Sequence, residues 1–473
     1  MMRAGRLHEA LAFAERAVEG VSRCVPAHGM LATILLHLGR ITDAETTVCE
    51  ALKHRQGTAD AYDALAHVSM LLGEYERSNA LYRRVVQIDP KEPRFGYNLA
   101  SSERSFGRLV DAEVACDHAI ALGPTHYATY LLRSELRIQT QEANHVDELR
   151  GHLSDPALPA RARVVLGYAL GKELDDLQRF DEAFHWFAKS ADSRRRQLAY
   201  NVAADEFKLA RISEVFPAAR SENEKPTQDS SRYIFIVGLP RSGTTLVEHI
   251  LTALSGVRSN GETENFSRAL ISAAPHGSGD LFVRSAAADA NTVAANYSRF
   301  ADRRAGDQKV IEKLPMNYLY LGAIRRALPS SKILLVKRQV IDSCFAMYRT
   351  LFDGAYPFSY DFEDLARYYV AYDNLVRHWR KCFGDTMFEV DYESLVRDPG
   401  TVGAGIAAYC DVQWVPAAIE VHKSASVSFT ASAAQIRRPI YGTSSGRWRH
   451  YRAHLGPLVK ALQLRGVPLP HDA

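Results

Sequence analysis

Residues 233–245 decide the fold of the C-terminal half, and their sequence is YIFIVGLPRSGTT. Tyr233–Val237 is a short apolar run, as expected of a strand that is buried on both faces of a parallel sheet. Gly238–Thr245 then supplies a glycine-containing loop, and the following residues LVEHILTAL have helical periodicity. Such a loop aims backbone N–H groups and a helix N-terminus at an anion. The stretch therefore predicts a phosphate-binding loop in an α/β domain with a central parallel sheet.

The charge in this loop is placed differently from the charge in loops that bind nucleoside triphosphates. Those loops have the pattern G-x-x-x-x-G-K-[ST], in which the lysine reaches the β- and γ-phosphates. Here Thr244 stands in place of the lysine, and the positive charge is at Arg241. A triphosphate-using kinase is therefore the weaker interpretation. The residues expected to bind the phosphate are Arg241, Ser242, Gly243, Thr244 and Thr245.

A second buried strand, Ile333–Val336, is followed by Arg338 and a helical stretch. Together with the string PRSGTT, this segment resembles P-loop-type sulfotransferases that use 3′-phosphoadenosine 5′-phosphosulfate (PAPS). The resemblance implies that Arg338 binds the 3′-phosphate of the donor. These enzymes have a serine eight residues later, where this chain has Ala346. Ser343 is expected to supply a substitute hydroxyl, because it is close to this position on the same helix.

Two further segments carry the same resemblance. Phe388–Pro399 is similar to a strand followed by Y-E-x-L-V-x-D-P, which implies that Tyr392 lies beside the adenine. Residues 432–439 and Gly446–Trp448 resemble segments of bacterial repeat-containing sulfotransferases and animal protein-tyrosine sulfotransferases. The resemblance implies a stabilising role for Ser432 and donor contacts for Arg438 and Arg447.

Sulfuryl transfer needs cations at the bridging oxygen and a base for the acceptor hydroxyl. Lys313, in VIEKLP, matches the lysine with which the family stabilises the transition state. The sequence GETE at residues 261–264 is similar to the segment that holds the catalytic glutamate of the tyrosine-modifying enzymes. That alignment favours Glu262 as the base and leaves Glu264 as the alternative. The mechanism requires no metal, and the sequence shows no cluster of metal ligands.

The N-terminal half repeats itself with a period of 34 residues, marked by Gly5, Gly39, Gly73 and Gly107. Small residues recur at fixed distances from each glycine, as in closely packed helix pairs. This pattern resembles tetratricopeptide repeats (TPR) over roughly residues 1–140, and a degenerate unit follows near residues 166–184. Stacked repeats form a solenoid whose concave face suits a peptide or protein partner, with a purely structural spacer as the alternative.

A polar, proline-containing run at residues 217–232 marks the expected domain boundary. The sequence thus predicts a TPR-like α-solenoid at 1–215, a linker at 216–231 and a sulfotransferase domain at 232–473. The 473 residues carry 58 basic and 55 acidic side chains, a balance that argues against nucleic acid as the main partner. The sequence contains no long apolar run that would span a membrane, so a cytoplasmic protein is expected.

The expected function is PAPS-dependent transfer of a sulfuryl group to a hydroxyl acceptor, with a protein tyrosine as the leading acceptor. A glycan, lipid or small-molecule acceptor stays open. The alternative from another class is a non-catalytic TPR interaction protein with a vestigial nucleotide site, which the alanine at position 346 would suit.

Overall fold

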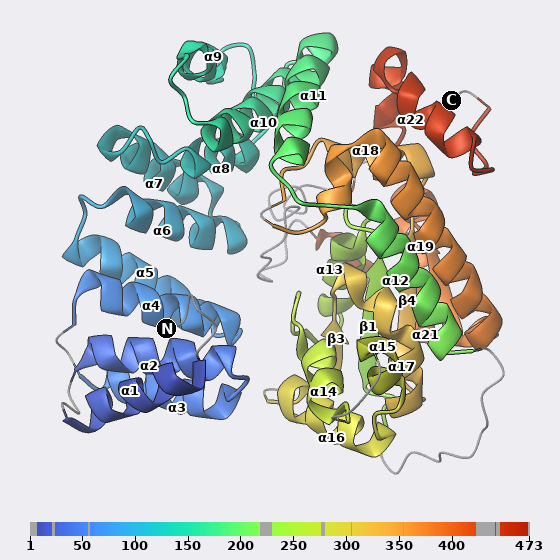
Figure 1. Cartoon of the computed structure of the whole chain (residues 1–473), viewed down its shortest axis with the longest axis horizontal. Helices are drawn as coiled ribbons and strands as arrows, with labels where there is room; N and C mark the ends of the chain where they lie inside the picture. Colours follow the sequence, from blue (N-terminus) through green and yellow to red (C-terminus); the bar gives the residue numbers. More distant parts are fainter. Residues whose placement is uncertain are drawn as a thin grey trace. The chain divides into compact units, whose positions relative to one another are not determined.

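The computed structural model describes residues 7–20, 24–54, 57–217, 229–275, 280–303, 305–352, 354–421, 440 and 445–471 (Figure 1). The chain divides into two compact units, Met1–Arg137 and Ile138–Ala473. The first unit is helical and the second contains a parallel sheet, so the predicted combination of a helical repeat region and an α/β domain is confirmed. None of the described helices is both long and apolar enough to cross a membrane.

The first unit stacks helices in successive pairs, drawn from blue to teal in Figure 1. Corresponding helices begin 34 residues apart, at Ile41, Tyr75 and Leu109. Its helices are α1 (Leu7–Gly20), α2 (Val25–His37), α3 (Ile41–Leu52), α4 (Ala59–Leu71), α5 (Tyr75–Ile88), α6 (Pro93–Ser105), α7 (Leu109–Leu122) and α8 (Ala128–Leu136).

Three of the four repeating glycines end the first helix of a pair, and Gly5 lies outside the described residues. Gly39, Gly73 and Gly107 have φ angles of 73°, 75° and 77°, a region that glycine adopts without a steric penalty. The N–H of the residue after each glycine donates back to the end of the helix. In the first of these turns, the Arg40 N–H donates to the Leu35 carbonyl at 2.9 Å. The 34-residue period in the sequence is therefore the period of this turn.

The small residues pack where the repeat pattern predicted a close seam. Ala44, Ser78 and Ala112, five residues after the glycines, are at most 1% exposed. Ala51 and Ala119, twelve residues after their glycines, are fully buried. The helices of a pair approach closely because these side chains are short.

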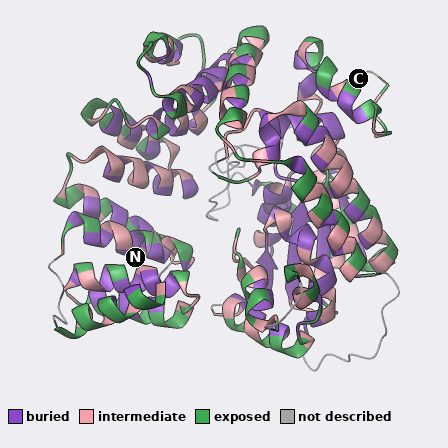
Figure 2. Ribbon diagram, in the orientation of Figure 1, coloured by how far each residue is buried: buried purple, intermediate pink, exposed green. Residues whose placement is uncertain are grey.

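The second unit is built around a parallel sheet with the strand order β2-β3-β1-β4-β5. Every residue of β1 is buried, as the apolar run predicted, and Figure 2 shows the central strands in the purple of buried residues. The strands are β1 (Tyr233–Gly238), β2 (Val257–Ser259), β3 (Lys309–Glu312), β4 (Lys332–Lys337) and β5 (Met387–Asp391).

Helices cover both faces of the sheet. On one face, α13 (Thr244–Thr252) and α21 (Pro399–Tyr409) share a hydrophobic cluster with β1 and β4. On the other face, the ring of Phe235 contacts Phe266 of α14 (Asn265–Ala273) and Tyr297 of α16 (Ala290–Ala301). Other elements of this unit are α15 (Leu281–Ala286), η2 (Pro315–Tyr320), α17 (Leu321–Ala327), α18 (Val340–Tyr348), η3 (Pro357–Tyr360), α19 (Phe362–Phe383), η4 (Gly384–Thr386), α20 (Tyr392–Arg397), η5 (Pro416–Ile419), η9 (Arg447–His454) and α22 (Gly456–Gln463).

Residues 138–217 belong to the same compact unit as the sheet. They form α9 (Val146–Ser154), α10 (Ala160–Asp176), α11 (Phe180–Arg196) and α12 (Val202–Val215). The α10–α11 turn resembles the repeat turn, with Gln178 at a φ of 61° in place of glycine. The Arg179 N–H donates to the Leu174 carbonyl at 2.9 Å, as the corresponding residues of the repeats do. This pair is the degenerate repeat unit.

The compact units divide between Arg137 and Ile138, and the domain boundary at 216–231 stays a prediction from the sequence. Helix α12 packs along α19, and the Arg367 Nε lies 2.8 Å from the Glu206 Oε1. The hydroxyl of Tyr168 on α10 donates to the carbonyl of Tyr348 on α18 at 3.1 Å. A polar run in the sequence marks a change of composition, whereas these contacts bring the last three helices before it into the C-terminal unit.

Candidate functional site

The sheet brings most of the described candidate residues to one edge. Because all five strands are parallel, their carboxyl ends lie on the same side, where α/β domains bind ligands. The phosphate loop follows β1. The other candidates follow the remaining strands within a few residues, namely Glu262 after β2, Lys313 after β3, Arg338 after β4 and Tyr392 after β5.

The loop after β1 requires its glycines for two different contacts. A Cβ on Gly238 would lie 2.5 Å from the carbonyl oxygen of Val336 in the neighbouring strand. A Cβ on Gly243, whose φ is 106°, would lie 2.3 Å from the ring of Tyr392. Arg241 also has a positive φ of 66°, which is unusual for a residue with a side chain. The backbone is therefore held in a tight loop immediately before α13.

The loop presents hydrogen-bond donors that an anion would satisfy. Helix α13 begins at Thr244, and the first N–H groups of a helix lack partners within the helix. The Oγ of Ser242 is buried and has no hydrogen-bond partner among the described residues. A buried hydroxyl without a partner costs free energy, so this arrangement fits a bound phosphate or sulfate.

Arg338 connects the ends of β1, β4 and β5. Its Nη1 donates to the Arg241 carbonyl at 3.0 Å, and its guanidinium carbon lies 4.9 Å from the centre of the Tyr392 ring. The Oγ of Ser343 is buried and donates to the Arg338 carbonyl at 3.4 Å. Ser343 is thus beside Arg338, but this contact is with its backbone. The proposed contact of Ser343 with the donor stays a prediction.

Lys313 and Glu262 form an ion pair. The Nζ of Lys313 is 2.5 Å from the Glu262 Oε1 and 3.5 Å from the Glu248 Oε2. The side chain of Lys313 is fully buried, whereas that of Glu262 is 36% exposed. Glu264 is 65% exposed and pairs with Arg268 instead. Lys313 thus pairs with Glu262 and Glu264 pairs with Arg268, and the choice of Glu262 as the base stays a prediction.

Glu248 lies beside Lys313, although no motif in the sequence pointed to it. It lies on α13, where its Oε1 accepts a hydrogen bond from the Ser259 hydroxyl at 2.5 Å. Burial raises the pKa of Glu248, and the Lys313 ammonium and the Ser259 hydroxyl partly oppose this. The signal in the sequence was an acidic residue on the apolar face of a helix, since such a residue needs a buried partner.

Glu312, the residue before Lys313, faces the other side of the sheet. Its Oε1 accepts from the Phe266 N–H at 3.2 Å and from the Asn317 Nδ2 at 3.3 Å. Burial raises its pKa to about 7, although these hydrogen bonds lower it. The carboxyl thus joins the start of α14 to η2.

Arg447 lies in a second polar cluster, around Asp175 of α10. The Asp175 Oδ2 is 2.6 Å from both the Arg447 Nη2 and the Arg349 Nη1. The Tyr451 hydroxyl donates to the Oδ1 of the same carboxylate. Arg447 is therefore held by protein side chains, and its contact with PAPS stays a prediction. Ser432 and Arg438 lie outside the described residues.

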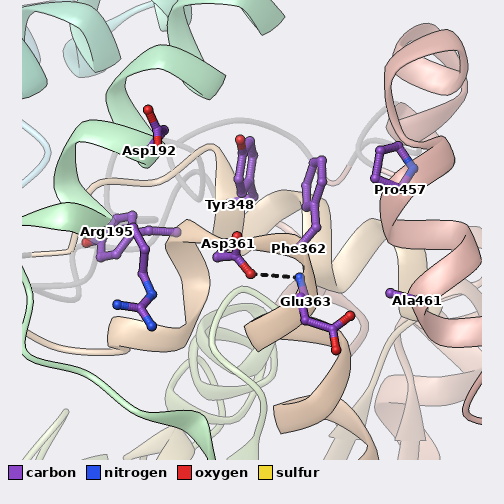
Figure 3. Close-up of a pocket in the computed structure, with 9 residues that line it drawn as sticks. Asp192, Arg195, Tyr348, Asp361, Phe362, Glu363, Pro457 and Ala461 are labelled. Carbon is purple, nitrogen blue, oxygen red and sulfur yellow. Dashed lines mark hydrogen bonds between the residues drawn. The ribbon is translucent and has the colours of Figure 1, made fainter.

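A cavity of about 320 Å³ in this unit lies beside α11, α19 and α22 (Figure 3). The rings of Tyr348 and Phe362 stack in its wall at 4.3 Å. The carboxylate of Asp361 in its lining accepts from the Glu363 N–H, the dashed contact in Figure 3. None of the candidate residues within the described ranges lines this cavity.

The comparisons with known proteins find two kinds of family along the chain. Residues 233–416 match the model of a sulfotransferase family, and residues 1–68 and 59–92 match tetratricopeptide repeat models. The chain combines tetratricopeptide repeats with a sulfotransferase domain. The matched sulfotransferase segment contains the β1 loop, Glu262, Lys313, Arg338 and Tyr392.

An uncharacterized protein of Aquifex aeolicus (strain VF5) is 27% identical over 373 residues. The match covers 76% of this chain and 49% of that protein, so the chain spans about half the length of the curated relative. The sulfotransferase domain of the Synechococcus PCC 7002 olefin synthase matches with 18% identity and a TM-score of 0.39, over 53% of this chain and 100% of that chain. YrrB, a TPR protein with an unusual peptide-binding site, matches with 16% identity and a TM-score of 0.27, over 39% of this chain and 84% of that chain.

Proposed function

We propose that the C-terminal unit transfers a sulfuryl group from PAPS to a hydroxyl acceptor, most notably a protein tyrosine. The observation that carries this proposal is the pairing of Lys313 with Glu262 at the edge of the sheet where the β1 loop also lies. The sulfotransferase domain supports sulfuryl transfer in general. The choice of PAPS as the sulfate donor and of a tyrosine as the acceptor is part of this proposal.

The residues around the loop suit the two phosphate positions of the donor. The N-terminus of α13 and the Ser242 hydroxyl would hold the 5′-phosphosulfate. Arg338 would bind the 3′-phosphate, because its guanidinium lies beside the loop and can donate several hydrogen bonds. Tyr392, which packs against Gly243, would lie beside the adenine.

The reaction needs one bond to form and one to break at sulfur. The acceptor oxygen attacks sulfur and loses its proton to the Glu262 carboxylate. The bond from sulfur to the bridging oxygen breaks, and its electron pair leaves on the phosphate of 3′,5′-bisphosphoadenosine. Lys313 and Arg241 stabilise that growing negative charge.

The ion pair between Glu262 and Lys313 would couple these two events. While Glu262 is ionised, the Lys313 ammonium is 2.5 Å from one of its oxygens. When Glu262 accepts the proton it becomes neutral, and its attraction for the ammonium falls. The charge of Lys313 is then available to the leaving oxygen at the moment when that oxygen becomes negative.

An aromatic side chain within electrostatic reach of Glu262 would suit the ring of a phenol acceptor. Tyr356 has a positive φ of 52°, and its ring contacts Phe352 at 4.8 Å. Burial raises the pKa of Tyr356, and the charge of Glu262 adds to the increase, so the ring lies within the electrostatic reach of the base. The repeats would hold the rest of a peptide or protein acceptor. The expected cytoplasmic location stays a prediction.

Mass spectrometry would test this function directly. The purified chain would be incubated with PAPS and a tyrosine peptide, a matched phenylalanine peptide, a glycan or a long-chain alcohol, with Lys313→Ala as the control. We expect the mass of one SO₃ group to be added to the tyrosine peptide alone. Transfer to another class would replace the acceptor assignment, and no transfer despite binding of the bisphosphonucleotide would favour the interaction protein.

A further inference from the structure

Asp175 holds three side chains from the C-terminal part of the unit. Its carboxylate is 3% exposed and accepts hydrogen bonds from Arg349, Arg447 and Tyr451. Burial raises the pKa of Asp175, but the two arginines and the hydrogen bond from Tyr451 together lower it by more than burial raises it. The pKa of Asp175 is therefore below its ordinary value. Asp175 therefore carries its charge inside the protein, between two guanidinium groups that would repel each other without it.

The backbone on both sides of Arg447 is fixed by a second carboxylate, Asp342 of α18. The Gly446 N–H donates to the Asp342 Oδ2 at 2.5 Å, and the Trp448 N–H donates to the Oδ1 at 3.2 Å. Asp342 is one helical turn from Arg338, whose Nη2 lies 3.9 Å from its Oδ1. The start of η9 is thus tied to the residue expected to bind the 3′-phosphate.

Arg447 is consequently anchored twice. Asp342 sets its backbone next to Arg338, and Asp175 sets the direction of its side chain. The Nε of Arg447 is buried and has no hydrogen-bond partner among the described residues. The Nη2 of Arg447 thus donates to Asp175, whereas its Nε makes no hydrogen bond with the described residues.

We propose that Asp175 is a positioning residue for the binding of PAPS. It holds Arg447 so that the remaining N–H groups of this guanidinium meet the 3′-phosphate of PAPS. This inference rests on the proposed function, because it assigns the 3′-phosphate of that donor to Arg447. Asp175 lies before the segment that matches the sulfotransferase model. The degenerate repeat pair α10–α11 is then part of the nucleotide site and not only a spacer.

Calorimetry with 3′,5′-bisphosphoadenosine and AMP would test this role in the full chain. We expect Asp175→Asn to weaken the binding of the bisphosphonucleotide about tenfold and to change the affinity for AMP less than twofold, since AMP lacks the 3′-phosphate. If Asp175 only neutralised the arginines, its removal would release positive charge, and the affinity would stay constant or rise. Either of these results would overturn the proposal.

Two further variants separate positioning from folding. Asp175→Asn combined with Arg349→Gln removes one charge of each sign, so the arginines no longer repel, and the selective tenfold loss should remain. Asp364→Asn is the control, because it breaks a different ion pair, between Asp364 of α19 and the Arg195 Nε of α11 at 2.6 Å. It should leave the affinities for AMP and for 3′,5′-bisphosphoadenosine unchanged. An equal loss of AMP and bisphosphonucleotide binding in the double variant would overturn the proposal. A wild-type chain without preference for the bisphosphonucleotide would refute the proposed donor itself.

Discussion

The ammonium of Lys313 lies 2.5 Å from the Oε1 of Glu262, although the two residues are 51 positions apart in the sequence. The parallel pairing of β2 and β3 accounts for this proximity, because Ser259 pairs with Ile311 just before both residues. The Lys313 N–H also donates to the Gly261 carbonyl at 3.1 Å, which extends the ladder beyond the strands. The backbone thus fixes the cation next to the carboxylate.

The first prediction concerns the general base. Glu262→Gln keeps the size and hydrogen-bonding capacity of the side chain but removes its basicity. We expect turnover to fall by about 10²–10⁴, with little change in the affinity for the donor. Initial rates at saturating donor, together with calorimetry of 3′,5′-bisphosphoadenosine, would measure the two effects separately.

Glu264→Gln is the matched control for this experiment. Glu264 is mostly exposed and pairs with Arg268, so its replacement should change the rate by less than about twofold. If the Glu264 variant were slow and the Glu262 variant normal, the role of base would pass to Glu264.

Much of this architecture could be predicted from the sequence, because it depends on local patterns. The period of Gly39, Gly73 and Gly107 reflects a backbone turn that needs a positive φ. The apolar run before Gly238 reflects a central strand buried on both faces. Such signals are contained within a few residues. Because the candidate residues directly follow the strands, the predicted strands also predicted the positions of these residues.

The sequence could not show the carboxylates that hold the site together. Asp175 and Arg447 are 272 positions apart, and neither residue type nor spacing links them. Glu248 meets Lys313 through the packing of α13 against the sheet, and Asp342 meets Gly446 through the contact of α18 with η9. The division of the compact units after Arg137 also could not be predicted, since the contacts of α10–α12 are between elements distant in the sequence.

The second prediction concerns the stability of the C-terminal unit against pH. Burial raises the pKa of Glu312 from 4.5 to about 7, so the folded protein binds its proton more tightly than the unfolded chain does. The stability that this proton provides is complete below about pH 4.5 and is lost as the pH rises through 7. The loss amounts to about 3 kcal/mol.

Glu312→Gln should remove this contribution, because the amide keeps a carbonyl acceptor for the Phe266 N–H and does not ionise. Urea unfolding at pH 5.5 and pH 8, followed by tryptophan fluorescence, would report on the C-terminal unit, since all four tryptophans lie in it. We expect the free energy of unfolding to fall less between these pH values in the variant. An equal fall in both proteins would show that Glu312 is not the group responsible.

The third prediction concerns the choice of nucleotide. Arg338 offers charged hydrogen bonds to a 3′-phosphate, and each such contact is worth roughly 1.5–3 kcal/mol. The chain should therefore bind 3′,5′-bisphosphoadenosine at least about tenfold more tightly than AMP. Arg338→Ala should reduce this ratio towards one. Equal affinities of the wild-type chain for the two nucleotides would contradict the assigned donor.

The fourth prediction concerns the smallest fragment that retains the site. Residues 138–473 keep Asp175 and the contact between α12 and α19, and they should bind the bisphosphonucleotide as the full chain does. A fragment of residues 232–473 loses those partners, so its binding should be weaker or its fold incomplete. Calorimetry and thermal unfolding of both fragments would decide. Equal binding by the shorter fragment would support the boundary at 216–231 instead.

The last prediction concerns Ala346, where the chain lacks the serine of similar sulfotransferases. Ala346 is buried on α18, while the nearby Ser343 hydroxyl already donates to the Arg338 carbonyl. Ser343→Ala should weaken binding of the bisphosphonucleotide about fivefold, because a net hydrogen bond contributes roughly 1 kcal/mol and this one steadies Arg338. Ala346→Ser should tighten binding modestly if its new hydroxyl reaches the 3′-phosphate. AMP serves as the reference ligand in both measurements, since neither substitution should change its affinity. If the wild-type chain bound no bisphosphonucleotide and Ala346→Ser did not create binding, the C-terminal unit would be a vestigial site carried by a repeat protein.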